Sequence, residues 1–179
     1  TLITGIGQGF MLASPLQLAH ATATIANRGG RFVPHVVGQI EDPMAQQASE
    51  TGFHERAGVT VLKPEYWDAI IDGMVAVVHG ERGTARRVGQ GASYRFAGKT
   101  GTAQLFTIAQ DEEADNEETP KHLRDHALFI AFAPVENPEI AVAIVVENGG
   151  SGSGAAAPIA RRILDYYLTG ATEDDVDDG

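Results

Sequence analysis

Residues 15–27 carry apolar side chains at helical spacing. Leu18, Ala21, Thr22 and Ile25 share one face of a helix drawn through this stretch. The pattern therefore predicts a helix with one buried side.

Both ends of this helix have recognisable signals. Ser14 is placed as N-cap, Pro15 stands at the first helical position, and Gln17 can close a capping box with Ser14. Gly29 and Gly30 follow the last periodic position and predict a left-handed stop.

Two later segments show the same periodicity, one between Pro64 and Gly80 and one over about 155–169. The side chains expected to be buried are Trp67, Ile70, Ile71, Met74 and Val78 in the first segment and Ile159, Ile163, Tyr167 and Leu168 in the second. A short helical turn is predicted over 83–89, "GTARRVG".

Two nearly continuous apolar runs, "HALFIAFAPV" (126–135) and "EIAVAIVVEN" (139–148), predict strands of an antiparallel hairpin. A third strand is expected over 94–106, "YRFAGKTGTAQLF". Because both faces of the hairpin are apolar, helices must cover both. The expected fold class is α/β of the α+β kind, an antiparallel sheet with helices on both faces.

The stretch between the first two helices has weaker signals. Residues 31–40 alternate slightly and predict a strand, which Pro34 places at a sheet edge. Residues 41–58 predict an irregular polar connection.

Composition indicates one globular domain of 179 residues with 43% hydrophobic residues and no apolar run long enough to span a bilayer. The net charge of −11 belongs to two segments, 111–118 and 173–178, which hold six and five acidic residues. The other 13 acidic side chains match the 13 Lys and Arg. With no basic face, nucleic acid is not an expected partner. The acidic end, 171–179, is expected to be a disordered tail.

The sequence has no cysteine, which excludes disulfides, thiol nucleophiles and zinc–thiolate sites. It starts "TLITGIGQGF", without an initiator methionine or a signal-peptide pattern. We expect any targeting segment to lie outside this sequence.

The stretch "AGKTGTAQ" (97–104) places one lysine among small residues. One interpretation is a phosphate loop, since Gly98, Lys99 and Thr100 match the end of that motif. Ser93 stands where the motif needs its first glycine, and the β-branched residues favour an extended chain over a helix. A second interpretation is a structural strand with its lysine in solvent.

The third interpretation explains the small residues. An extended ligand would lie along the strand edge, and Gly101 would keep the approach to the backbone open. Thr100 and Thr102 would present hydroxyls, and the ammonium of Lys99 would suit a carboxylate-bearing substrate and proton transfer.

Other candidate residues carry weaker signals. "GIGQG" (5–9) has the wrong spacing for a dinucleotide fingerprint. Phe106 could line a cleft or belong to the core. His122, Asp125 and His126 could hold a metal, although an ion pair of Asp125 with Arg124 is the favoured interpretation, and no metal site is expected.

K-[ST]-G on a strand is one of three signature elements of penicillin-binding proteins and serine β-lactamases, besides S-x-x-K and S-x-[ND]. In combination with "GIGQGFMLASPLQLAHATATIANRGG", "GTA" at 83–85, and "LRDHALFIAFAPVENPEIAVAIVVENGG", the sequence resembles the C-terminal part of a class B penicillin-binding protein transpeptidase domain over residues 1–170. The stretches "LRDHALFIAFAP" and "VVENGG" resemble the elongation-associated members most.

None of the five serines begins S-x-x-K or S-x-[ND]. The resemblance therefore implies that the nucleophilic serine and the second motif lie upstream of Thr1. In this family the serine attacks the penultimate D-alanine of a peptidoglycan stem, and an amine resolves the acyl-enzyme.

The resemblance further implies a role for each residue of the lysine strand. Lys99 would supply positive charge to the proton relay, Thr100 and Thr102 would hold the substrate carboxylate, and the N–H of Thr102 would be an oxyanion donor beside Gly101.

Peptidoglycan stem peptides, β-lactams and membrane-bound cell-elongation proteins are the implied partners, and no cofactor is implied. The implied location is the periplasmic face of the inner membrane, with an anchor outside this chain. The alternatives are an inactive cell-wall-peptide sensor or scaffold of the same fold and, more remotely, a nucleotide hydrolase.

Overall fold

The computed structural model describes residues 12–42, 47–50, 52, 54–104 and 120–171. Its helices are α2 (Pro15–Ala26), α3 (Glu65–His79), α4 (Arg86–Gly89) and α5 (Ala157–Thr169), with a 3-10 turn at Lys121–Leu123 and a π-helical turn at Gly152–Ala156. Its strands are β1 (Arg31–Phe32), β2 (Gln39–Asp42), β3 (Gln47–Glu50), β4 (Glu55–Arg56), β5 (Ala97–Ala103), β6 (His126–Ala133) and β7 (Ile140–Val146).

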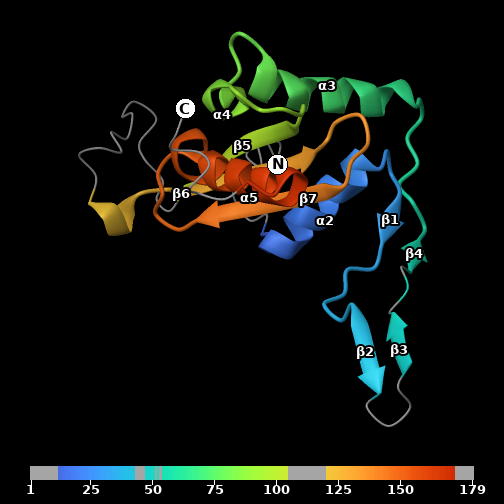
Figure 1. The fold of residues 1–179 in the computed structure, drawn as a ribbon. Helices are drawn as coiled ribbons and strands as arrows, with labels where there is room; N and C mark the ends of the chain where they lie inside the picture. The colour runs from blue at the N-terminus through green and yellow to red at the C-terminus, as the bar shows by residue number, and fades with distance from the viewer. Residues whose placement is uncertain (1–11, 43–46, 51, 53, 105–119, 172–179) are drawn as a thin grey trace.

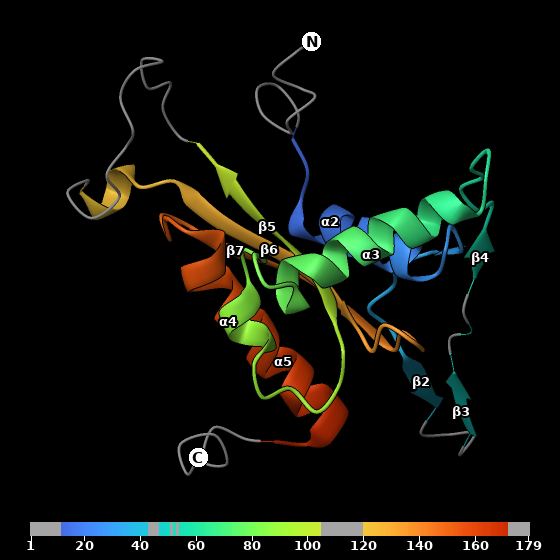
Figure 2. The ribbon, with the colours of Figure 1, turned by 90° about the horizontal axis from the view of Figure 1, so that it is seen from above.

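The body of the protein is a three-stranded antiparallel sheet in the order β5-β6-β7. Helix α5 covers one face, α2 covers the other, and α3 lies along β5 (Figures 1 and 2). The predicted hairpin and the predicted cover on both faces are therefore confirmed. Within this sheet β5 has β6 on one side only, so its other side is an edge.

The two faces of the sheet carry separate apolar clusters. Phe129 is fully buried in a cluster with Ala160 and Leu164 of α5. Phe132, of opposite parity on β6, is fully buried in a cluster that includes Ala26 of α2 and Met74 of α3. Because side chains alternate along a strand, one apolar run serves both clusters.

The capping prediction for α2 is confirmed. The N–H of Gln17 donates to Ser14 Oγ at 3.3 Å, and the N–H of Ser14 donates to Gln17 Oε1 at 2.8 Å. The predicted left-handed stop lies one residue earlier than expected. Arg28 (φ 51°) and Gly29 (φ 98°) have positive φ, whereas Gly30 does not.

Some predicted buried faces are wrong in detail. In α3, Trp67, Ile71, Met74 and Val78 are buried as expected, but Ile70 is exposed. Ala21 of α2 is also exposed, and the buried residues of that helix are Thr22, Thr24 and Ala26.

Helix α5 is rotated relative to its prediction. Ile159, Ile163 and Tyr167 are exposed, whereas Leu168 packs against the core. The buried positions are Ala157, Ala160 and Leu164. The small side chains on this buried face let the helix approach the sheet closely. Because alanine is less hydrophobic than the isoleucines beside it, the hydrophobic pattern alone indicated the wrong face.

The prediction for residues 31–58 is wrong. Instead of one strand and an irregular connection, β1 pairs with β4 and β2 pairs with β3, each in a two-stranded antiparallel sheet. Figure 1 shows this segment as an arm that extends away from the body. Pro34, which has no N–H to donate, follows β1 and separates it from β2.

A half-buried polar network joins α5 to the segment that leads into β5. Arg161 donates to Asp165 at 2.7 and 2.8 Å and to the carbonyl oxygens of Val88 and Gln90 at 2.7 and 3.0 Å. The hydroxyl of Tyr94 donates to Asp165 at 2.7 Å. Burial and this carboxylate raise the pKa of Tyr94 above its usual range, so the phenol stays protonated and remains a donor.

Candidate active site

Strand β5 places the lysine motif at the accessible edge of the sheet. Lys99 and Thr102 are exposed, and Thr100 and Gly101 are half-buried. The strand is shorter than predicted, because residues 94–96 and Gln104 lie outside it. Residues 99–102 are thus not packed under other side chains, a position that would have excluded a ligand.

The motif divides between the two faces of β5. Lys99 lies opposite Ile130 and Gly101 opposite Leu128, whereas Thr102 lies opposite Ala127. Thr100 and Thr102 therefore share one face, and Lys99 and Gly101 share the other, as the alternation of a strand requires. The ammonium and the two hydroxyls approach the strand edge from opposite sides.

Lys99 borders a cavity of about 340 Å³ between β5 and the end of α3. Its ammonium donates a hydrogen bond to the carbonyl oxygen of Thr100 at 2.7 Å. The residues that line the cavity with it are Gly73, Ala76, Val77, Gly80, Arg82, Gly83 and Thr84. A cationic side chain thus stands between a concave surface and the strand edge.

Thr84 lies beside the lysine motif, and the sequence interpretation gave it no role. Its hydroxyl oxygen lies 3.1 Å from the hydroxyl oxygen of Thr100, across 16 positions of sequence. The available signal was the "GTA" at 83–85, which contributed to the resemblance but received no role. The contact joins the loop after α3 to the lysine strand.

Gly152 is a second residue without a predicted role. It is buried in the π-helical turn, directly against the backbone of β5 and β6. A Cβ at this position would collide with the carbonyl oxygen of Leu128 and would lie 2.7 Å from that of Gly101. Gly152 therefore lets the turn support the strand immediately behind Gly101.

Replacing Gly152 with alanine is expected to destabilise the fold by about 1–3 kcal/mol, because the new methyl group must displace β5 or the turn. The melting temperature measures this effect. Gly154→Ala is the matched control, since its Cβ would meet only Ser151, at 3.7 Å or more. Equal behaviour of the two variants would contradict this role.

His79 links the last turn of α3 to the residue that precedes β5. Its Nε2 accepts a hydrogen bond from the N–H of Phe96 at 3.3 Å, and the two rings meet edge to face with centroids 5.5 Å apart. Partial loss of solvent around the imidazole lowers the pKa of His79 below its usual 6.5. The neutral ring is the form that can accept this bond.

Acidification from about pH 7.5 to about pH 5.5 is expected to weaken this link. A base whose pKa is depressed on folding contributes stability above the unfolded-state pKa, and loses it as the pH falls through the folded-state pKa. Amide hydrogen exchange at Phe96, corrected for the intrinsic rate, should therefore lose protection in the wild type. In His79→Gln the protection should not change with pH, and a wild type that stays equally protected would contradict the prediction.

The alternative chemistries find no support in the described part of the chain. The residues after Lys99 continue as a strand, so the phosphate-loop interpretation, which needs a helix there, is wrong. No group of three His, Asp or Glu among the described residues could hold a metal, and His126 Nδ1 accepts the N–H of Asn148 at 3.0 Å. The Arg124–Asp125 ion pair stays a prediction. Phe106, the 5–9 glycines, and the acidic segments 111–118 and 173–178 lie outside the described residues.

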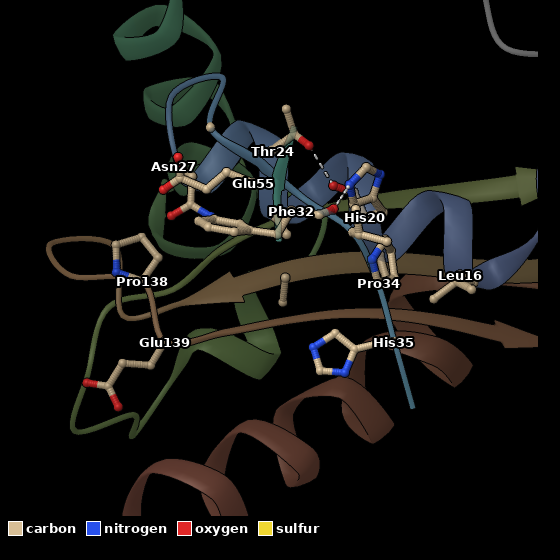
Figure 3. Close-up of a pocket in the computed structure, with 15 residues that line it drawn as sticks. Leu16, His20, Thr24, Asn27, Phe32, Pro34, His35, Glu55, Pro138 and Glu139 are labelled. Atoms are coloured by element: carbon tan, nitrogen blue, oxygen red, sulfur yellow. Dashed lines mark hydrogen bonds between the residues drawn. The ribbon is translucent and has the colours of Figure 1, made fainter. Parts of the chain in front are cut away.

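A larger cavity, of about 820 Å³, lies between α2, the β1 segment and the turn that joins β6 to β7 (Figure 3). His20 at its wall donates from Nε2 to the carbonyl oxygen of Phe32 at 2.9 Å. None of the predicted site residues lines this cavity.

Comparison with known proteins bears on the whole chain. The family model described as the penicillin binding protein transpeptidase domain matches residues 1–165. Peptidoglycan D,D-transpeptidase MrdA of Haemophilus influenzae is 40% identical over 168 residues, which are 94% of this chain and 26% of the relative. Among the described residues, none of the helices combines the length and the apolar character that a membrane span requires.

Solved structures agree with this relationship. The imipenem acyl-enzyme complex of penicillin-binding protein A from M. tuberculosis is 30% identical with a TM-score of 0.72, over 93% of this chain and 33% of that one. Penicillin-binding protein PBP2 of Helicobacter pylori, solved in complex with MreC, is 29% identical with a TM-score of 0.71, over 95% and 28% of the two chains.

The chain thus spans 26% of the length of the H. influenzae relative and 33% of the M. tuberculosis chain. The resemblance and the fold class expected from the sequence are confirmed, and the chain belongs to the family of penicillin-binding protein transpeptidase domains.

Proposed function

We propose that this chain forms the C-terminal part of a peptidoglycan D,D-transpeptidase of the elongation-associated kind, and that its β5 edge is one wall of the active site. The observation that carries the proposal is the lysine motif on an exposed strand edge beside a cavity, in a chain of the transpeptidase family. The relatives' names, MrdA and PBP2, support the elongation-associated kind.

The proposed reaction proceeds through a serine ester. A serine in a segment preceding Thr1 attacks the carbonyl carbon of the penultimate D-alanine, the peptide bond breaks, and the terminal D-alanine leaves as an amine that takes up a proton. An amine of a second stem then attacks the ester, forms the new amide bond and releases the serine. Lys99 supplies positive charge to the relay that moves these protons.

The N–H of Thr102 is proposed to stabilise the oxyanion of both tetrahedral intermediates. In an antiparallel edge strand, alternate residues direct their backbone groups away from the partner strand. The carbonyl oxygen of Thr100 accepts a hydrogen bond from the Lys99 ammonium. This supports an outward direction for the backbone groups of Thr100 and for those of Thr102, two positions on. A glycine between them leaves room for an acyl group at this edge.

The Thr100 and Thr102 hydroxyls are proposed to bind the terminal carboxylate of the stem. They lie on one face of β5, within reach of the same anionic group. β-Lactams are proposed to acylate the same serine, which is supported by the M. tuberculosis relative, solved as an imipenem acyl-enzyme complex. Proposed protein partners are membrane-bound elongation proteins, since the H. pylori relative was solved with MreC. The proposed location is the periplasmic face of the inner membrane.

Acylation of the full-length protein by a fluorescent penicillin tests this function. The expected result is one labelled serine, in an S-x-x-K sequence upstream of this chain when the modified peptide is mapped. Loss of label after mutation of that serine to alanine is the control. A full-length protein that folds but is never labelled would instead support the alternative of an inactive peptide-binding scaffold.

A further inference from the structure

The contact between Thr84 and Thr100 has no part in the mechanism described above. The two hydroxyl oxygens are 3.1 Å apart, and both side chains are exposed enough to meet a ligand at the β5 edge. Thr84 and Lys99 also line the same cavity. The contact therefore lies within the proposed active site.

The backbone holds Thr84 in a fixed position. The N–H of Ala85 donates to the carbonyl oxygen of Val77 at 3.0 Å, and that of Gly83 donates to Gly80 at 3.0 Å. Ala85 is buried in the core. A Cβ at Gly83 would collide with the carbonyl oxygens of Ala76 and Val77, which explains the glycine beside Thr84.

A threonine hydroxyl has one hydrogen to donate and can accept at the same time. If Thr100 donated to Thr84, its hydrogen would be unavailable to a substrate carboxylate. If Thr84 donates to Thr100, the Thr100 hydrogen stays available and its donor strength increases, because successive hydrogen bonds polarise one another. A carboxylate accepts hydrogen bonds and donates none, so its binding selects the second direction.

We propose that Thr84 is a positioning residue for carboxylate recognition: its hydroxyl donates to Thr100 Oγ1 and thereby directs the Thr100 hydroxyl hydrogen at the terminal carboxylate of the substrate. This inference rests on the proposed function, and it assigns a part of carboxylate specificity to the loop after α3. Thr84 acts through Thr100 and forms no bond with the reacting atoms.

The test compares two probes in the full-length protein: a penicillin with a free carboxylate and the methyl ester of the same penicillin. In Thr84→Val, which keeps the shape but lacks the hydroxyl, acylation by the free acid should slow by about tenfold. Acylation by the ester should hardly change, because the charged acceptor is missing. Thr84→Ser, which keeps the hydroxyl, should restore the wild-type rate with the free acid.

A second comparison excludes a merely structural effect. In a Thr100→Val background, Thr84→Val should cause no further slowing, because the residue through which it acts is absent. Thr60→Val makes the same chemical change at an exposed position outside the cavity and should behave as wild type.

The possible outcomes separate the two proposals. Equal slowing with both probes, an unchanged rate in Thr84→Val, or additive effects in the double variant would each overturn the role of Thr84 and leave the transpeptidase proposal intact. A wild type labelled by neither probe would overturn the proposed function, and this inference with it.

Discussion

Replacing Lys99 with alanine is expected to slow acylation of the full-length protein by penicillin by about a thousandfold. The ammonium stands at the strand edge, at the border of the cavity, and donates to the carbonyl oxygen of Thr100. In the proposed mechanism, its loss removes both the positive charge that attracts an anionic substrate and a member of the proton relay. The pseudo-first-order rate of labelling over a range of penicillin concentrations measures both contributions.

Two variants give this prediction its controls. Lys99→Arg keeps the charge but holds its protons too firmly for a relay, so binding should recover more than the rate of acylation. Lys63→Ala removes an exposed lysine just before α3 and should leave labelling unchanged. A wild-type rate in Lys99→Ala would remove Lys99 from the mechanism.

Replacing Gly101 with valine is expected to reduce acylation by about 10²–10³-fold, the effect of losing one oxyanion donor. A side chain at position 101 would project on the face of β5 that carries Lys99, and would obstruct an incoming acyl group. The structure adds a second cost, since a Cβ at Gly101 would be 3.2 Å from that of Leu128. The strand must therefore shift by a few tenths of an ångström, away from the geometry that the acyl group needs.

Melting temperature separates the two effects of this substitution. Gly101→Ala introduces the close contact with Leu128 without a branched side chain. Its rate of labelling should therefore fall between those of the wild type and Gly101→Val. At Gly38, a Cβ would meet nothing within 4 Å, so Gly38→Val controls for valine at an open glycine. Normal labelling of a folded Gly101→Val would refute the proposed approach of the acyl group.

Those parts of the fold that depend on local sequence were predictable. The Ser14 capping box is a contact between residues three positions apart, and the β6–β7 hairpin follows from two apolar runs with a short connection. The accessibility of Lys99 and Thr102 followed from the small side chains around them. In each case the cause and the effect lie in the same few residues.

The errors arose where distant packing decides. The face of α5 is chosen by the close approach of Ala157 and Ala160 to the sheet, which outweighs the larger isoleucines. The arm of residues 31–56 forms two small paired sheets, although neither half has a strong strand pattern.

The candidate site shows the same limit. The contacts of Thr84 with Thr100, and of Gly152 with Gly101, cross 16 and 51 positions of sequence. The lysine motif identifies one strand of the site, whereas its supports come from a loop and a turn that only the fold brings to it. Glycine and threonine are common in loops, so neither residue type marks its position.

The proposed mechanism requires the edge of β5 to receive the acyl group beside Lys99. A crystal structure of the full-length protein acylated by penicillin measures this directly. We expect the acyl carbonyl oxygen to lie about 2.7–3.1 Å from the backbone nitrogen of Thr102. We also expect the penicillin carboxylate to lie within hydrogen-bond distance of the Thr100 and Thr102 hydroxyls. An acyl group whose carbonyl oxygen points away from β5, with its carboxylate bound by other residues, would contradict the proposed mechanism.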